Sequence, residues 1–412
     1  MTNRITEDLQ QLVQGCNRFA VDLYRQLGDD IDHQFFFSPY SISCALGMTL
    51  AGAKENSACE IRQLLHLNMP EDRIHGAFAE LHKQTKTEGL KFNLANRIWV
   101  QDGYAFELEG VETLKELHRV GIGLVDFSQA ESACHEINAW VADQTENRIT
   151  ELVTCLPPLT RMILTNAIYF AGYWEEEFSE FSTSELPFWY TTEESFNTSM
   201  MRQTAEFPYR EDSVAQVLQM PYRQGLAPLS SPEEESWAEF KKRIDDVKQN
   251  GNQFAMQIVL PKENASLAEL EGQLDEYSPI TKMNSDLARV NVRLPKFHFE
   301  YGASLKEALQ SLGMLDCFAL AKANFRGFSR HPEGLFIGEI AHQAMIRVDE
   351  RGSEAAAAIA VGGCAAMERD RPIEFRADHP FVVQIIDRRT GLIHFMGRVT
   401  RPTPAVADRT GD

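Results

Sequence analysis

The stretch Asp349-Glu-Arg-Gly-Ser-Glu-Ala-Ala-Ala-Ala-Ile-Ala-Val-Gly-Gly-Cys-Ala-Ala-Met-Glu-Arg-Asp-Arg-Pro372 decides the fold. Just before it, residues 340–349 alternate in the period of a strand with one buried face, whose inward set is Ile340, His342, Ala344, Ile346 and Val348. The alternation stops at Gly352, which can adopt backbone angles closed to other residues and therefore suits a hinge. From Ser353 to the next proline the side chains are mostly small and every backbone N–H is free to join a sheet. The stretch therefore reads as a loop that can become a strand.

A flexible Ala/Gly linker between two domains is the alternative on composition alone. The flanking residues disfavour it. Residues 379–387 and 391–399 read as two apolar strands joined by an Arg-Arg-Thr-Gly turn, and they finish a core without leaving room for another domain. We therefore expect one globular domain over residues 1–412, with the loop strung across it at about 350–371.

Several motifs in this chain resemble those of the serpin family. Glu350-Arg-Gly-Ser-Glu-Ala-Ala-Ala-Ala358 is similar to the serpin inhibitory hinge, and Ala377-Asp-His-Pro-Phe381 with Phe395-Met-Gly-Arg398 is similar to the C-terminal signature. Further similar blocks follow the family order, at residues 36–42, 45–53, 94–100, 137–141, 165–174, 294–297 and 312–318. The resemblance thus covers nearly the whole chain and implies an α+β serpin fold: a mixed five-stranded central sheet, two further β-sheets, about nine helices and an exposed reactive loop.

The residue patterns place many of these elements independently. Apolar spacing of three or four predicts helices over 9–27, after Ser38-Pro39, and over 55–68, 71–87 and 131–147. Strands are expected over 93–101, 161–170, 207–222, 254–260 and 289–301. The family pattern is interrupted by an insertion at about 224–252, where Trp237, Phe240, Ile244 and Val247 share one helical face. That helix either lies on its own body, which we favour, or docks a partner.

Composition limits the classes of partner. The net charge of −20 disfavours nucleic acid, because an acidic surface repels phosphates. No apolar run reaches membrane-spanning length, and the N-terminal residues lack the pattern of a signal peptide. Seven cysteines without a spacing pattern fit free thiols in a reducing compartment. We expect a cytoplasmic monomer without metal or cofactor, although release by a non-classical route stays open.

The resemblance implies that the functional site is a peptide bond that a protease attacks. Counting from Gly352 at the family interval places Ala366 before the attacked bond and Met367 after it. Small, uncharged residues precede the bond, so an elastase-like protease with a shallow apolar pocket is expected. Arg369 and Arg371 would instead suit trypsin-like enzymes. Cys364 in the same loop is more readily a small tolerated side chain than a redox switch.

The implied mechanism is a suicide trap. After cleavage, the hinge residues Glu350, Gly352, Ser353, Glu354, Ala355, Ala356, Ala357 and Ala358 would enter the central sheet, and small side chains would keep insertion faster than deacylation. Ser38, Ser41, Asn166 and His342 match the family positions where that sheet opens. Lys296 and Glu350 match a salt-bridging pair near the top of that sheet, and Trp174 matches the aromatic lid there. Without the family, His342 on an apolar strand face reads as a hydrogen-bonded core histidine.

Two other function classes are weighed against inhibition. An enzyme is disfavoured because the sequence contains no Gly-x-Ser-x-Gly, His-Glu-x-x-His, Cys-x-x-Cys or phosphate-binding glycine loop. A serpin-like carrier or chaperone that no longer inhibits would typically carry bulky, charged or proline residues in the hinge, and Ser353 to Ala358 remain small apart from Glu354. Inhibition of cysteine proteases is a further alternative.

Overall fold

The structure is a computed structural model that describes residues 6–28, 33–85, 90–105, 107–114, 122–157, 159–223, 253–277, 279, 287–353 and 371–403. Several predicted features lie outside these residues. They are the insertion at 224–252 with Trp237, the hinge residues Glu354, Ala355, Ala356, Ala357 and Ala358, Cys364, Arg369, and the Ala366–Met367 bond.

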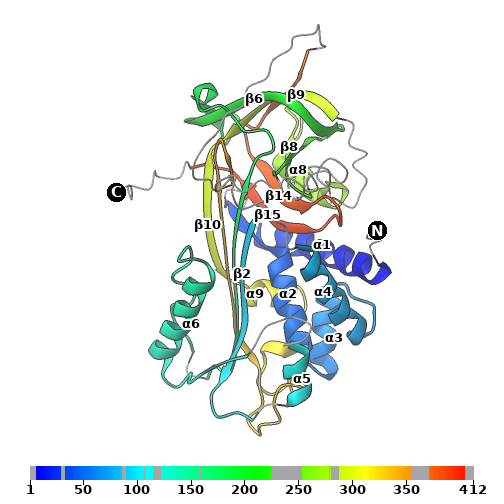
Figure 1. Cartoon of the computed structure of the whole chain (residues 1–412), viewed down its shortest axis with the longest axis vertical. Helices are drawn as coiled ribbons and strands as arrows, with labels where there is room; N and C mark the ends of the chain where they lie inside the picture. The colour runs from blue at the N-terminus through cyan, green and yellow to red at the C-terminus, as the bar shows by residue number, and fades with distance from the viewer. Residues whose placement is uncertain are drawn as a thin grey trace, which may run out of the picture.

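Because Gly352–Ser353 forms the short strand β12, the central sheet contains six strands, one more than predicted. Its order is β10-β11-β12-β4-β2-β3, with bounds β10 Phe297–Ser304, β11 Ile337–Val348, β12 Gly352–Ser353, β4 Met162–Tyr173, β2 Lys91–Gln101 and β3 Ile122–Val125. β11 runs parallel to β4 and antiparallel to β10, so the sheet is mixed. Its strands run along the long axis of the molecule (Figure 1). The fold class predicted from the sequence is confirmed.

The two further sheets share one long strand. β6, Ser195–Glu211, pairs β5 and β9 along its first part and β7 at its end. The resulting path is β1-β15-β14-β8-β7-β6-β9-β13, with β5 beside β6. The other bounds are β1 Phe35–Phe37, β5 Ser184–Trp189, β7 Ala215–Pro221, β8 Phe254–Pro261, β9 Leu287–Pro295, β13 Ile373–Arg376, β14 Phe381–Asp387 and β15 Ile393–Val399.

Two of the predicted strands are interrupted. The segment 207–222 is a hairpin, because Asp212 accepts hydrogen bonds from the backbone of Val214 and Ala215 and turns the chain between β6 and β7. The segment 289–301 divides at Lys296 into β9 and β10, which belong to different sheets. Alternation and composition alone did not separate the strands in either case.

Eight α-helices lie in the described part of the chain: α1 Glu7–Leu27, α2 Pro39–Leu50, α3 Glu55–Leu64, α4 Glu71–Thr85, α5 Leu108–Thr113, α6 Ala130–Gln144, α8 Leu267–Gly272 and α9 Lys306–Ser311. The Ser38-Pro39 start of α2 is confirmed, since Ser38 Oγ accepts a hydrogen bond from Ser41 N–H. α6 ends before Asn147, which has a φ of 59° and donates its N–H to Ala142 O.

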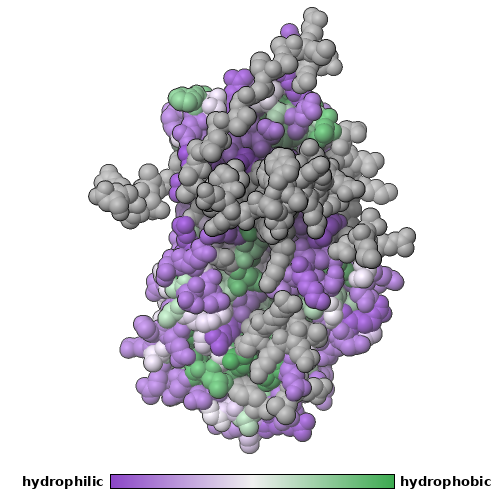
Figure 2. Space-filling model, viewed as in Figure 1, coloured by the Kyte–Doolittle hydropathy of each residue, from purple (hydrophilic) through white to green (hydrophobic). Residues whose placement is uncertain are grey.

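Helices cover both faces of the central sheet (Figure 1). α6 lies on one face, where Ile137 packs with Trp99, Ile163 and Ala341. α1, α2 and α4 lie toward the other. β11 is therefore buried on both faces rather than one, which corrects the sequence expectation: Gln343 and Met345 on its other face are each only 7% exposed. Hydrophilic residues cover much of the described surface seen in Figure 2.

Candidate functional site: the opening of the central sheet

The segment predicted to be the hinge begins inside the central sheet. β12 lies between β11 and β4, with Ser353 opposite Val348 on one side and Gly172 on the other. Gly352 has a φ of 155°, and a Cβ there would lie 2.1 Å from the carbonyl oxygen of Gly172. Only glycine fits this position, so the predicted hinge glycine has a steric basis.

Ser353 is fully buried at this entry point. Its hydroxyl lies 2.7 Å from the hydroxyl of Tyr222. Sequence reasoning did not single out Tyr222, because the two residues are far apart in the chain. Burial raises the pKa of Tyr222, so the phenol stays protonated and can donate to Ser353.

Along the rest of the seam between β4 and β11, from Met162 to Tyr169 of β4, the two strands are direct neighbours, so the sheet is closed there. β11 and β4 pair directly and in parallel, with His342 opposite Asn166 and Ala344 opposite Ile168. Further insertion of the hinge would have to separate these two strands and would replace their single ladder with two antiparallel ladders. The structure thus shows the sheet open for two residues at one end of this seam and paired along the rest.

Five buried polar residues form a connected hydrogen-bonded group at the closed seam, and we call them the clasp: Ser38, Ser41, Asn96, Asn166 and His342. Asn166 Nδ2 donates to Asn96 Oδ1 at 2.6 Å, and Ser41 Oγ donates to the same oxygen at 3.1 Å. The side chains of Asn166 and His342 hydrogen-bond to each other across the seam. The structure therefore brings the four predicted sheet-opening residues together; their role in opening stays a prediction.

Asn96 is the member of the clasp that sequence reasoning missed. It lies opposite Asn166 in the β2–β4 register, and its side chain also donates to Ser41 O at 2.9 Å. The available signal was a polar amide on the inward face of an apolar strand, which requires a buried partner. The sequence does not say which partner, because register is a tertiary property.

His342 holds the seam as a neutral ring. It is fully buried, and burial lowers its pKa to about 3. Its Nε2 accepts the backbone N–H of Ser38 at 3.3 Å, so its proton sits on Nδ1 and is donated to Asn166 Oδ1. This agrees with the expectation of a hydrogen-bonded core histidine.

The lid above the opening consists of Trp174, Lys296 and Glu350. Trp174 stacks on Tyr222 with centroids 4.7 Å apart and donates its indole N–H to Asp349 O at 3.0 Å. Lys296 Nζ lies 2.9 Å from Glu350 Oε2. Burial acts to raise the pKa of Glu350, but hydrogen bonds from Lys296 and Thr183 outweigh it and leave the pKa lowered. Glu350 is therefore ionised at neutral pH.

The far end of the loop has its own anchor. β13 pairs in parallel with β9, with Phe375 opposite Val292, so β12 before the loop and β13 after it belong to different sheets. The reactive loop expected at about 350–371 therefore connects two sheets, which gives its two ends separate attachments.

The described residues contain no group of three or more His, Cys, Asp or Glu arranged to hold a metal ion. Nor does any helix among them have the length and apolar character needed to cross a membrane.

Comparison with known proteins agrees with this architecture. Residues 14–402 match the family model described as serpin (serine protease inhibitor). The chain is 37% identical to an uncharacterized serpin-like protein of Thermococcus kodakarensis, covering 95% of this chain and 86% of that one. It is 34% identical to the mouse (Mus musculus) leukocyte elastase inhibitor A, covering 96% and 100%.

Among solved structures, human thyroxine-binding globulin in complex with thyroxine superposes with a TM-score of 0.79 at 25% identity, covering 96% of this chain and 100% of that one. The family model and the similar relatives span almost the entire sequence. This chain belongs to the serpin family.

Proposed function

We propose that this protein is an irreversible suicide-substrate inhibitor of serine proteases of the elastase kind, and not an enzyme. The position of β12 carries the proposal. Gly352 and Ser353 already pair with β4, and the β4–β11 seam next to them contains a buried polar pair, Asn166 and His342, among mainly apolar residues. The hinge thus starts where the rest of the loop would enter.

The proposed reaction begins as ordinary proteolysis. The protease serine attacks the carbonyl of Ala366, the bond to Met367 breaks, and the leaving amine of Met367 takes a proton from the protease histidine. The acyl-enzyme then links the protease to Ala366. Insertion of the arm from Ser353 onward would carry the protease with it and distort its active site before water can deacylate it.

Strand pairing would drive the insertion. Separating β4 from β11 breaks one parallel ladder, and the new strand forms an antiparallel ladder with each neighbour. Because β11 is buried on both faces, both faces of the inserted arm would also be covered. Small hinge residues such as Ala355 and Ala357 meet this steric requirement.

The specificity proposal depends on Ala366. A small, uncharged residue before the attacked bond fits a shallow apolar pocket. The similarity to leukocyte elastase inhibitor A of the mouse supports this choice. Cleavage after Arg369 by a trypsin-like enzyme, or attack by a cysteine protease, would lead to the same trap with different target selection.

A non-inhibitory carrier is the second candidate, because the fold is also similar to a thyroxine-binding globulin. The small hinge residues favour inhibition. We further propose that the protein acts as a monomer in the cytoplasm, or after non-classical release, on proteases rather than on nucleic acid or membranes; its seven cysteines without a spacing pattern and its net charge of −20 support this.

The deciding experiment mixes the full chain with pancreatic elastase, followed by a denaturing gel and mass spectrometry of the released peptide. We expect a covalent complex that survives denaturation, together with a peptide that begins at Met367. Complete cleavage without a complex would favour the carrier. Absence of cleavage would contradict the elastase assignment, and trypsin would then test Arg369.

A further inference from the structure

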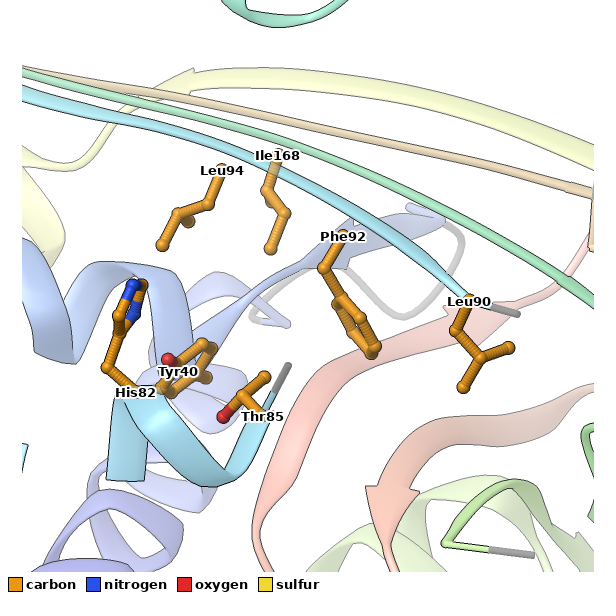
Figure 3. Close-up of a pocket in the computed structure, with 7 residues that line it drawn as sticks. All are labelled: Tyr40, His82, Thr85, Leu90, Phe92, Leu94 and Ile168. Carbon is orange, nitrogen blue, oxygen red and sulfur yellow. The ribbon is translucent and has the colours of Figure 1, made fainter. Parts of the chain in front are cut away.

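The central sheet is covered differently on its two faces. On one face, side chains of β2 and β4 face those of α2 and α4 across a cavity of about 200 Å³ (Figure 3). On the other face lie α6 and the residues that follow it, 149–157, which we call the return segment. Two cysteines belong to this second cover, Cys134 on α6 and Cys155 on the return segment.

The return segment runs back along α6. At the end of the helix, the hydroxyl of Thr145 accepts the backbone N–H of Ile149 at 3.2 Å. Further along, the side-chain oxygen of Asn138 accepts the backbone N–H groups of Leu152 and Val153, each at 3.0 Å. The segment is therefore antiparallel to the helix and passes Asn138 on its way toward the N-terminal end of α6.

This direction brings Cys155 level with Cys134. Cys134 lies one helical turn before Asn138 on the same face, a rise of about 6 Å. Cys155 lies two residues beyond Val153, a length of at most about 7 Å. Burial raises the pKa of Cys134, and the charge of an ionised Cys155 adds to the shift, as expected of neighbouring thiols. Both thiols are free and Cys155 is exposed, so a soluble oxidant can reach it.

The return segment also spans the seam between β4 and β11. Val153 and Leu156 are buried in one cluster with Ile163 of β4 and Ala341 of β11. Residues 151–155 form one wall of a cavity of about 360 Å³ whose other wall comes from β10 and β11. Separating β4 from β11 moves Ile163 away from Ala341, so the return segment must shift for the seam to widen. A covalent bond between this segment and α6 would restrict the shift.

We propose that Cys134 and Cys155 form a reversible disulfide that ties the return segment to α6, and that this disulfide slows insertion of the loop between β4 and β11. The oxidant is glutathione disulfide. The Cys155 thiolate attacks one of its sulfur atoms and releases one glutathione, and the Cys134 thiolate then attacks the Cys155 sulfur and releases the second. Two protein thiols lose two electrons, and their two protons pass to the two glutathione thiolates. The reduced protein is the faster inhibitor.

Formation of the bond is tested on the full chain, equilibrated in glutathione buffers, quenched with acid, alkylated and mapped by mass spectrometry. We expect a linked pair of peptides that contain Cys134 and Cys155. At a fixed ratio of reduced to oxidised glutathione, a tenfold higher total concentration should lower the linked-to-reduced ratio about tenfold, because linkage releases two glutathiones. Recovery of Cys155 as a mixed disulfide with glutathione, with Cys134 alkylated, overturns the proposal.

Cys59 provides an internal control for this titration. It is exposed on α3, so it should form only a mixed disulfide with glutathione. The occupancy of a mixed disulfide depends on the ratio of reduced to oxidised glutathione and should not change with their total concentration. The same concentration dependence at Cys59 and at the linked pair would overturn the intramolecular bond.

The effect on insertion is measured in a Cys364→Ser background, because Cys364 lies two residues before Ala366 and its oxidation would affect protease attack directly. The oxidised protein is desalted and mixed with elastase. The ratio of cleaved to covalent product should rise about tenfold over the reduced protein, which corresponds to about 1.4 kcal/mol on the insertion barrier. Dithiothreitol followed by desalting should restore the reduced value. Adding Cys155→Ser should abolish the response to the oxidant.

This effect rests on the proposed inhibitory function and is read separately from the peptide map. A mapped disulfide with an unchanged product ratio overturns the regulatory role, and so does an equal response in the Cys155→Ser variant. If neither redox state forms a covalent complex, the inhibitor proposal fails, whereas the peptide map still decides whether the disulfide forms.

Discussion

At the scale of single residues, the protein combines apolar packing with a few buried polar groups that must find partners. The clasp satisfies its members, so removing one leaves the others without a hydrogen bond in a dry environment. His394 differs, because it is fully buried and neither ring nitrogen has a hydrogen-bond partner among the described residues. Removing a clasp side chain should therefore lower the stability of the protein, whereas replacing His394 with an apolar ring should not.

Asn166→Ala should destabilise the protein. It removes the acceptor of His342 Nδ1–H and the donor to Asn96 Oδ1, so we expect a loss of about 2 kcal/mol. The measurement is the free energy of the first unfolding transition in urea. Asn264→Ala, at an exposed turn position, is the control and should change stability by less than about 0.5 kcal/mol. Equal effects of the two variants would contradict the role given to the clasp.

Stability should fall as the pH decreases below about 6.5. Burial lowers the pKa of His342 and of His394 to about 3, so the folded state keeps both rings neutral where the unfolded chain takes up protons. Each ring then contributes a loss of about 1.4 kcal/mol per pH unit between 6.5 and 3. Urea unfolding at pH 7.5 and pH 5.5 measures the difference.

His394→Phe provides the control for this pH dependence. The ring packs against Tyr40, Phe92 and Phe254, with centroids 4.7 to 5.2 Å away, so an apolar ring suits the site. The variant should be at least as stable as wild type at pH 7.5 and should lose less stability at pH 5.5. An unchanged pH response would show that His394 does not contribute.

At the scale of elements, the seam between β4 and β11 is the part of the fold that the proposed loop insertion would open. β12 pairs with both strands at the open end, and the loop returns at β13 on a different sheet. α6 covers the same sheet, and Asn138 on that helix holds the following segment through the backbone N–H groups of Leu152 and Val153. An inserted strand would therefore pass under a packed helix, which limits the size of its side chains.

Ala357→Arg should convert the inhibitor into a substrate. A buried guanidinium without a partner in the inserted arm would be costly, so insertion would become slower than deacylation. The expected result with elastase is complete cleavage and no covalent band. Glu368→Arg places the same side chain on the leaving peptide and should retain the complex. A normal yield of complex with Ala357→Arg would contradict the insertion mechanism.

At the scale of the whole molecule, the proposed function requires a native state that is not the most stable state of the chain. Cleavage of the loop without trapping should release the arm, complete the sheet and raise the temperature of unfolding. Calorimetry on the wild type before and after cleavage of the loop by a metalloprotease, which forms no acyl-enzyme and can be removed, measures this change. Ala357→Arg cleaved in the same way should show a smaller increase, and equal increases would contradict the link between the hinge and insertion.

Local features were predictable because short-range geometry determines them. The α2 cap at Ser38 and the presence of a strand at β11, though not its burial on both faces, were predicted from neighbouring residues. The fold itself was predicted from many short motifs in family order. The extent of β6 and the split at Lys296 were not predicted, because strand ends depend on which partners a strand meets.

The sequence by itself therefore determined the fold class and most elements, and it named Gly352 and the residues expected at the sheet opening, whose roles stay predictions. Only the tertiary structure decided that Asn96 faces Asn166, that Tyr222 meets Ser353, and that β2, β4, α2 and α4 enclose a cavity. The physical reason is sequence separation. A cap or a strand period depends on adjacent residues, whereas each of these contacts depends on the register and packing of segments that are distant in the chain.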